Sequence, residues 1–133
     1  MQKNSTFYGL GIAPRLLEIL ANLKFTAPTP IQERAIPAAL EGKDLIGIAQ
    51  TGTGKTLAFG IPMIQHIAQA KSCGLVILPT RELAIQVEEA LRQVGHTLGL
   101  KTAVLIGGAS MGQQINALTK RPHIIIGTPG RII

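Results

Sequence analysis

Apolar residues recur at helical spacing in the first forty positions of the chain. Within residues 13–23 they lie on one face, and Pro14 stands in the first turn, where a helix tolerates proline. Two prolines exclude a helix interior over residues 25–30, and residues 31–40 again show a helical pattern interrupted by Pro37. The sequence therefore predicts two short helices, the second with a kink or an early stop at its proline.

From Asp44 onward, short apolar runs alternate with longer segments of helical period. Strands are expected at 44–49, 75–78, 102–106 and 123–126, with helices from about 55 to 70, from 81 to 98 and up to about 119. Such alternation is typical of a parallel sheet with helices on both faces. The predicted fold class is α/β. The last residues, TPGRII, look like the first turn of one more helix, so we expect the sequence to stop in mid-unit.

Composition narrows the class of protein. The chain has 133 residues, of which 46% are hydrophobic and 15% charged, so it is expected to be one globular domain and not a disordered tail. A single cysteine excludes a disulfide-stapled scaffold and a cysteine-based zinc site. No apolar run reaches the roughly 18 residues of a membrane span, which predicts a soluble, cytoplasmic protein without a membrane partner.

Net charge and aromatic content bear on the partner. Thirteen Lys and Arg against seven Asp and Glu give +6, which favours polyanions such as nucleotides and nucleic acids. Aromatic residues make up only 3% of the chain, which argues against a sheet that stacks several bases. Any nucleic acid is therefore expected to be held mainly by its backbone.

A glycine-rich segment, AQTGTGKT, lies between a predicted strand and a predicted helix. Its glycines let backbone N–H groups curl around one anion, Lys55 is placed to neutralise β and γ phosphates, and the Thr56 hydroxyl is placed to coordinate Mg²⁺. The alternative is an ordinary turn whose lysine is solvated. The flanking strand and helix favour a phosphate loop, made of Thr51, Gly52, Thr53, Gly54, Lys55 and Thr56.

Five short motifs in order give the chain a family resemblance. FTAPTPIQ ends at Gln32 with Phe7 upstream, AQTGTGKT follows, and after it come PTRELA, the pair Gly107 and Gly108, and finally TPGR. The chain thereby resembles a DEAD-box ATP-dependent RNA helicase over nearly its whole length. The resemblance implies an incomplete RecA-like P-loop NTPase domain, with a Q-motif region over 1–42 and a P-loop α/β core over 43–133. Lys24 departs from the family pattern, which usually has glycine there.

The resemblance implies a role for each motif residue. Gln32 would read adenine, because an amide donates and accepts at once, Thr29 would also bind the nucleotide, and Phe7 would cover the base. The alternative for Phe7 is a core or surface aromatic. Lys55 and Thr56 would be the catalytic residues, with ATP and Mg²⁺ as cofactors. The RNA backbone would be bound, without sequence preference, by Pro79, Thr80, Arg81, Glu82, Gly107, Gly108, Thr128, Pro129, Gly130 and Arg131.

The family's Asp-Glu-Ala-Asp stretch does not occur in these residues, in which Asp44 is the one aspartate. The Ser-Ala-Thr motif and the second RecA-like domain are not found either. In the family's sheet, the strands that carry these two motifs lie between segment 44–49 and the other strands. We therefore expect a chain that binds ATP and RNA without hydrolysis or unwinding, and that forms a homodimer or larger assembly through the incomplete sheet edge. The alternative is a shortened, non-catalytic binding or interaction module.

Overall fold

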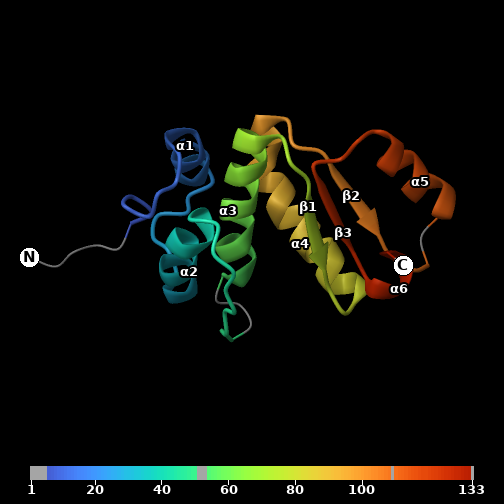
Figure 1. Ribbon diagram of the computed structural model, residues 1–133, viewed down its shortest axis with the longest axis horizontal. Helices are drawn as coiled ribbons and strands as arrows, with labels where there is room; N and C mark the ends of the chain where they lie inside the picture. Colours follow the sequence, from blue (N-terminus) through green and yellow to red (C-terminus); the bar gives the residue numbers. More distant parts are fainter. Residues whose placement is uncertain (1–5, 51–53, 109, 133) are drawn as a thin grey trace, which may run out of the picture. The chain divides into compact units, whose positions relative to one another are not determined.

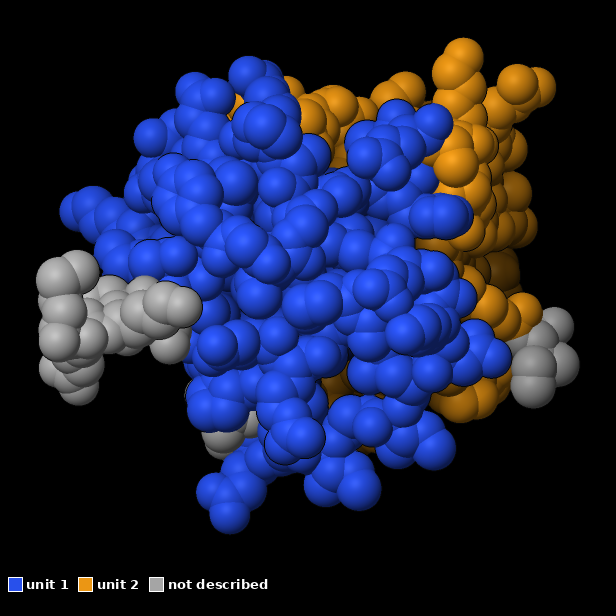
Figure 2. Space-filling model, turned by 60° about the vertical axis from the view of Figure 1, so that its left-hand side comes forward, with its two compact units in different colours: residues 1–69 blue, residues 70–133 orange. Residues whose placement is uncertain are grey.

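The computed structural model describes residues 6–50, 54–108 and 110–132. The chain divides into two compact units, residues 1–69 and 70–133, coloured separately in Figure 2. The division expected from the motifs, 1–42 and 43–133, stays a prediction. Each unit is described by itself below.

Three helices build the first unit (Figure 1): α1 (Pro14–Asn22), α2 (Pro30–Leu40) and α3 (Lys55–Ala70). The predicted positions of all three are confirmed to within a residue or two. The early stop at Pro37 is wrong, because α2 continues to Leu40. Proline removes only one amide donor from the ladder, and the fully buried Ile36 beside it holds this turn of the helix in the core. The core of the unit consists of Phe7, Ile12, Leu16, Ile19, Leu20, Ala35, Ile36, Leu57, Ala58, Ile61, Ile64 and Ile67.

The segment expected to be the first strand, residues 44–49, has no regular secondary structure. Ile46 and Ile48 are 92% and 91% exposed. A strand exists only through hydrogen bonds to a neighbour, and the family resemblance places beside this segment two strands whose motifs do not occur in the 133 residues. Its apolar pattern therefore predicted a strand that finds no partner in the part of the chain described here.

The second unit contains a parallel sheet of three strands, β1 (Gly74–Ile77), β2 (Thr102–Leu105) and β3 (Ile124–Gly127). Their spatial order is β1-β3-β2, and Val76, Ile126 and Val104 stand side by side in register. Around the sheet run α4 (Arg81–Gly95), the short 3-10 turn η1 (His96–Leu98), α5 (Met111–Thr119) and α6 (Pro129–Ile132) (Figure 1). These positions confirm the remaining predicted elements, shifted by at most a few residues.

Helices cover both faces of this sheet. On one face Val76, Ile124 and Ile126 are buried, and Glu88 of α4 accepts a 3.0 Å hydrogen bond from the hydroxyl of Thr102. On the other face Ala103 and Leu105 of β2 are buried, and α5 contacts β2. Leu75 and Ile77 of β1, on that same face, are each 54% exposed. The α/β prediction is confirmed, with the cover over β1 incomplete among the described residues.

Candidate nucleotide and RNA site

Gln32 joins the start of α2 to the end of the glycine-rich loop. Its Oε1 accepts a 2.9 Å hydrogen bond from the backbone N–H of Thr29, and its Nε2 donates a 3.1 Å bond to the carbonyl of Gly54. The side chain is only 4% exposed. An amide has two donor and two acceptor positions, so one N–H and one lone pair remain for a ligand. The Q motif and the phosphate loop are thus in direct contact.

Two features of this contact require glycine at position 54, its backbone conformation and the space around its Cα. Its φ is +87°, a left-handed conformation that side chains rarely adopt. A Cβ built on it would overlap the amide nitrogen of Gln32 and come 2.9 Å from the hydroxyl oxygen of Thr29. The loop backbone therefore approaches α2 as closely as a glycine allows.

The Thr29 hydroxyl lies beside the contact between Gln32 and Gly54. Thr29 precedes α2, and its Oγ1 is buried without a hydrogen-bond partner in the structure as described. An unpaired buried hydroxyl costs about 1–3 kcal/mol. This hydroxyl, together with the remaining N–H and lone pair of the Gln32 amide, leaves unpaired hydrogen-bonding groups beside Gly54.

The phosphate loop leads directly into α3. Lys55, the first residue of the helix, is exposed, and Thr56 is half-buried. The predicted contributions of Thr51, Gly52 and Thr53 lie outside the described residues. Within the described part of the chain, no three His, Cys, Asp or Glu side chains come together as a metal site. A magnesium ion that fits here would be held by phosphate oxygens and the Thr56 hydroxyl, since Mg²⁺ keeps waters and takes few protein ligands.

Phe7 lies in the core of the first unit and is 5% exposed. Its ring faces are covered by protein in this structure, as in the alternative interpretation of a core aromatic. Its role in covering adenine stays a prediction.

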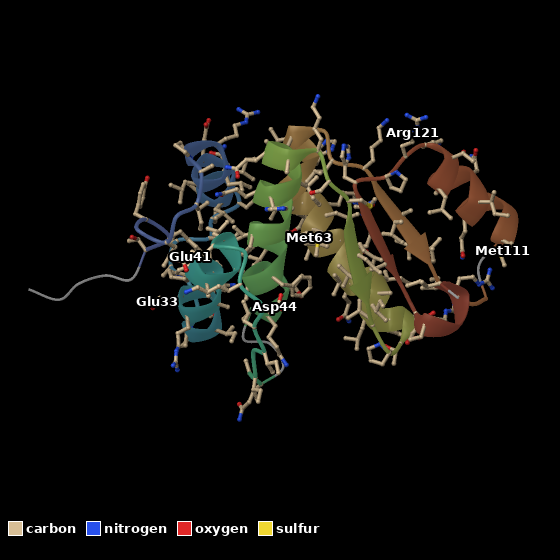
Figure 3. The ribbon with its side chains drawn as sticks, in the orientation of Figure 1. Glu33, Glu41, Asp44, Met63, Met111 and Arg121 are labelled. Carbon is tan, nitrogen blue, oxygen red and sulfur yellow. The ribbon has the colours of Figure 1, made fainter. Side chains whose placement is uncertain are left out.

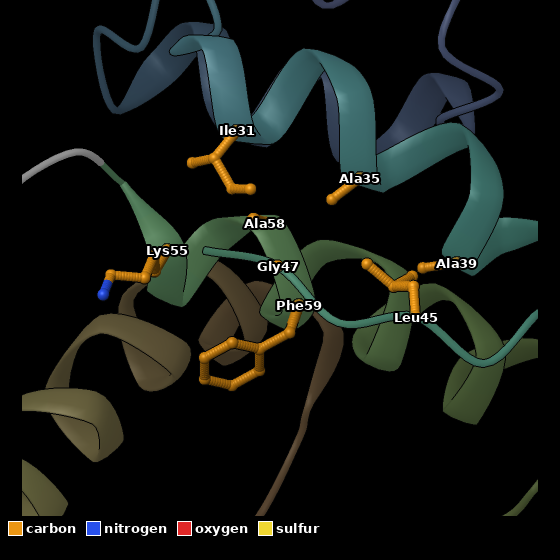
Figure 4. A pocket seen from close by; sticks show the side chains of 8 residues that line it. All are labelled: Ile31, Ala35, Ala39, Leu45, Gly47, Lys55, Ala58 and Phe59. Carbon is orange, nitrogen blue, oxygen red and sulfur yellow. The ribbon is translucent and has the colours of Figure 1, made fainter. Parts of the chain in front are cut away.

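An apolar pocket of about 250 Å³ lies between α2, α3 and the segment that follows α2 (Figure 4). In Figure 4 the ammonium group of Lys55, at one end, points away from the other side chains. Because the rest of the lining is apolar, the pocket offers few polar partners to a nucleotide base. It is lined by Ile31, Ala35, Ala39, Leu45, Gly47, Lys55, Ala58 and Phe59.

In the second unit, the three motifs predicted to bind RNA meet at one edge of the sheet. PTRE follows β1, the glycine pair follows β2, and TPGR follows β3, beyond the register row of Ile77, Gly127 and Leu105. The carboxyl ends of parallel strands meet at one edge, where such folds place their binding loops. Backbone bonds continue this alignment, since the N–H of Thr128 donates to the carbonyl of Leu105 at 3.0 Å.

Thr80 caps α4. Its side chain accepts a 3.2 Å hydrogen bond from the backbone N–H of Leu83, and the exposed Glu82 lies in the first turn, where the helix dipole favours a carboxylate. At Thr128, the backbone carbonyl accepts from the N–H groups of Arg131 and Ile132.

The two motif arginines both contact the segment after β2. Arg81 lies over Gly108, where a Cβ would come 2.8 Å from the arginine Nη1, and Gly108 has a φ of +81°. Arg131 donates a 3.5 Å hydrogen bond to the sulfur of Met111. Met111 is the first residue of α5 and is labelled in Figure 3. The edge therefore presents two guanidinium groups beside a close-packed backbone turn.

Neither arginine is neutralised by a carboxylate in the described ranges, where the ion pairs are Lys43 with Glu41 and Arg92 with Glu88. The 2.8 Å hydrogen bond from Lys43, together with its charge, lowers the pKa of Glu41, and the same bond raises the pKa of Lys43. Both groups are exposed after the end of α2, away from the phosphate loop. The positive charge of Arg81 and Arg131 thus remains available to an anion.

Two buried glutamines escaped the sequence analysis. Gln65 of α3 accepts from the N–H of Ala13 and donates to the carbonyl of Gly11, and Gln114 of α5 donates a 2.8 Å bond to the carbonyl of Ile106. The Oε1 of Gln114 is buried without a hydrogen-bond partner in the described chain. In the sequence, each could have been recognised as a polar residue at a position where the helical period predicts an apolar one.

No helix among the residues described is long and apolar enough to cross a bilayer.

Comparison with known proteins gives a consistent picture. Residues 29–133 match the family model described as DEAD/DEAH box helicase. The ATP-dependent rRNA helicase RRP3 of Scheffersomyces stipitis is 53% identical over 133 residues, which cover 98% of this chain and 28% of the relative. The chain thus spans less than a third of that relative's length.

Solved structures agree with this fold. The RNA helicase Prp28 of Chaetomium thermophilum bound to ADP has a TM-score of 0.87 and 41% identity, and the match covers 96% of this chain and 33% of Prp28. Dbp5 of S. cerevisiae bound to RNA and ADP BeF3 has a TM-score of 0.80 and 34% identity, with 96% and 33% covered.

Proposed function

Because the chain belongs to the DEAD/DEAH box helicase family, with the fold of a partial RecA-like helicase domain, we propose that it binds ATP and the RNA backbone as the N-terminal part of an ATP-dependent RNA helicase. The observation that carries the proposal is the contact between the two ends of the nucleotide site. Gln32 donates to Gly54, so the adenine-reading motif and the phosphate loop form one structure. The solved relative bound to ADP supports the choice of nucleotide.

In this proposal each part of the site has one task. The loop N–H groups and Lys55 hold the phosphates, Thr56 and the phosphates hold Mg²⁺, and the spare positions of the Gln32 amide read the adenine edge. Bound Mg²⁺ supplies charge neutralisation at the phosphates. Thr29, with its unpaired hydroxyl, is the second group that a nucleotide would satisfy.

At the sheet edge, Arg81 and Arg131 contact RNA phosphates, and the residues of the three loops supply backbone N–H groups and surface. These contacts reach sugar and phosphate and carry no base preference. The name of the RRP3 relative points to ribosomal RNA as the substrate class. We propose that the 133 residues alone neither hydrolyse ATP nor separate strands, because the one aspartate, Asp44, precedes the loop and no carboxylate follows it at a Walker B position.

The experiment compares adenine and guanine nucleotides on the 133-residue chain. We expect ADP and ATP to bind in preference to GDP and GTP, and Gln32→Ala to remove that preference. Lys55→Ala should weaken the binding of adenine and guanine nucleotides alike by about tenfold or more, because a charge-assisted bond to the phosphates is lost. Isothermal titration measures each affinity. Equal affinity of the unmodified chain for adenine and guanine would contradict the role of Gln32, and unchanged affinity of Lys55→Gln would contradict the phosphate loop.

A further inference from the structure

Gln114 is the buried residue of α5. It is 6% exposed, and no other residue of this helix, all of which the structure describes, is buried. Its two neighbours in the chain, Gln113 and Ile115, are both exposed. A helix that covers a sheet usually packs against it through a stripe of apolar side chains. In α5 the amide of Gln114 stands at the centre of that contact instead.

This amide joins α5 to the end of β2. Its Nε2 donates a 2.8 Å hydrogen bond to the carbonyl of Ile106, the residue directly after β2, which is 7% exposed. The next two residues are Gly107 and Gly108 of the predicted RNA edge. A hydrogen bond depends on distance and on angle, whereas apolar burial has no direction. The bond from Gln114 therefore sets how α5 lies against the glycine pair.

The other end of the amide adds little to stability. The Oε1 of Gln114 is buried without a hydrogen-bond partner in the described chain. The cost of this unpaired oxygen offsets part of what the bond to Ile106 contributes. The particular contribution of Gln114 is thus the direction of its bond.

Both motif arginines contact the two segments that Gln114 joins. Arg81 lies against Gly108, and Arg131 donates a 3.5 Å hydrogen bond to the sulfur of Met111. Met111 precedes Gln114 by three residues on α5, so these two side chains lie on the same side of the helix. A shift of α5 against the glycine pair would therefore change the spacing between the two guanidinium groups.

We infer that Gln114 is a positioning residue for RNA binding. It contacts no RNA itself but sets the spacing of Arg81 and Arg131, which decides whether both reach phosphates of one strand. This inference rests on the proposed function, since it adds a determinant to the same RNA edge. Its specific consequence is that the effect of Gln114 on RNA affinity requires both arginines.

The first test substitutes Gln114→Met in the 133-residue chain, which keeps an unbranched side chain of similar length and removes the amide. Affinity for single-stranded RNA, measured by fluorescence anisotropy, is expected to fall about three- to tenfold. The slope of log affinity against log salt should fall by about one unit, because one arginine loses its phosphate. In a chain that already carries Arg131→Ala, Gln114→Met should cause no further loss. Unchanged affinity, an unchanged slope, or an equal loss with and without Arg131 would overturn the inference.

The matched control is Gln113→Met. Gln113 is the exposed neighbour on the same helix, and its backbone N–H, not its side chain, donates to the hydroxyl of Ser110. The same substitution there should leave RNA affinity and salt slope unchanged. A loss equal to that of Gln114→Met would assign the effect to α5 in general and reject the positioning role.

A second variant keeps the inference testable if Gln114→Met does not fold. Met111 is 54% exposed, so Met111→Ala leaves the buried amide in place but removes the sulfur that Arg131 contacts. RNA affinity is expected to fall about two- to threefold, and no further when Arg131 is replaced as well. Ile115→Ala, at a position of α5 that is also 54% exposed, should leave the affinity unchanged. Unchanged affinity of Met111→Ala would show that α5 does not position Arg131 and would overturn the inference.

Failure of this inference is distinguishable from failure of the proposed function. If Arg81→Ala and Arg131→Ala weaken RNA binding as expected but Gln114→Met and Met111→Ala do not, only the positioning role is wrong. If neither arginine substitution has an effect, the RNA edge itself is wrong.

Discussion

Lys24 adopts a left-handed backbone, with a φ of +66°, two residues after the end of α1. The N–H of Lys24 donates to the carbonyl of Ala21, and the N–H of Phe25 donates to that of Leu20, which is the hydrogen-bond pattern of a Schellman C-cap. Glycine is the usual residue at this position, and the DEAD-box pattern has glycine here. The departure seen in the sequence thus coincides with a conformation that a side chain disfavours.

Lys24→Gly is expected to stabilise the chain by about 1 kcal/mol, because relief of left-handed strain exceeds the entropy that glycine adds to the unfolded state. Urea unfolding followed by circular dichroism measures the change. Lys24→Ala is the control, since it shortens the side chain but keeps the Cβ and should bring no gain. Equal stabilisation by both variants would assign the effect to the lysine side chain.

Gly54 combines a positive φ with a close approach to Gln32, and these two demands can be separated. Gly54→Ala should weaken ADP binding by about tenfold or more, because its Cβ displaces the Gln32 amide. Gly9 has a nearly identical φ of +85° with nothing within 4 Å of a Cβ, so Gly9→Ala carries the backbone strain alone. We expect Gly9→Ala to lower stability and leave ADP affinity unchanged. Titration calorimetry on both variants decides which demand matters.

At the scale of elements, the RNA edge depends on three loops that bring together two arginines. Arg81→Ala and Arg131→Ala should each weaken binding to single-stranded RNA and reduce the slope of log affinity against log salt by about one unit, as expected for one phosphate contact. Arg92→Ala, at the other end of α4 and paired with Glu88, serves as control. Fluorescence anisotropy with RNAs of different base sequence gives both slope and preference. A strong base preference that survives both substitutions would contradict backbone recognition.

The helices could be predicted because their determinants are local. Pro14 in a first turn and Thr80 as an N-cap fix helix starts from neighbouring residues alone. A strand is defined by its partner, and residues 44–49 have the apolar pattern without a partner among the described residues. Local reasoning therefore identified strands 74–77, 102–105 and 124–127 to within one residue and failed at the one segment that needed a distant neighbour.

The difference between local and distant determinants also applies to the candidate nucleotide site. The motifs identified which residues belong to it, but not their contacts. The bond from Gln32 to Gly54 crosses 22 residues, and those of Gln65 cross 52 and 54. A glutamine in an amphipathic helix is equally compatible with solvent or burial in the sequence. Only the folded unit decides between them.

At the scale of the whole molecule, both units expose apolar residues that were predicted to lie in a sheet. Ile46 and Ile48 of the first unit are more than 90% exposed, and Leu75 and Ile77 of the second are half exposed. Burial of one isoleucine or leucine side chain is worth about 1.5–3 kcal/mol. Four such exposed residues favour association, and two of them belong to β1, whose outer edge is unpaired among the described residues.

We therefore expect the 133-residue chain to be a dimer or larger in solution and to lack RNA-stimulated ATP turnover. Sedimentation velocity measures the first property and a coupled ATPase assay the second. Replacing Ile46 and Ile48 together by lysine should shift the chain towards monomer, because two charges replace exposed apolar surface. Replacing Leu23 and Leu118 by lysine should not shift the chain towards monomer, because both are exposed outside the predicted sheet region.

A chain extended through the Asp-Glu-Ala-Asp and Ser-Ala-Thr motifs should sediment as a monomer, since its own strands then cover the exposed apolar residues. A compact monomer of the unextended chain would contradict the association, and robust ATP turnover by it would mean that a carboxylate such as Glu82 serves the metal.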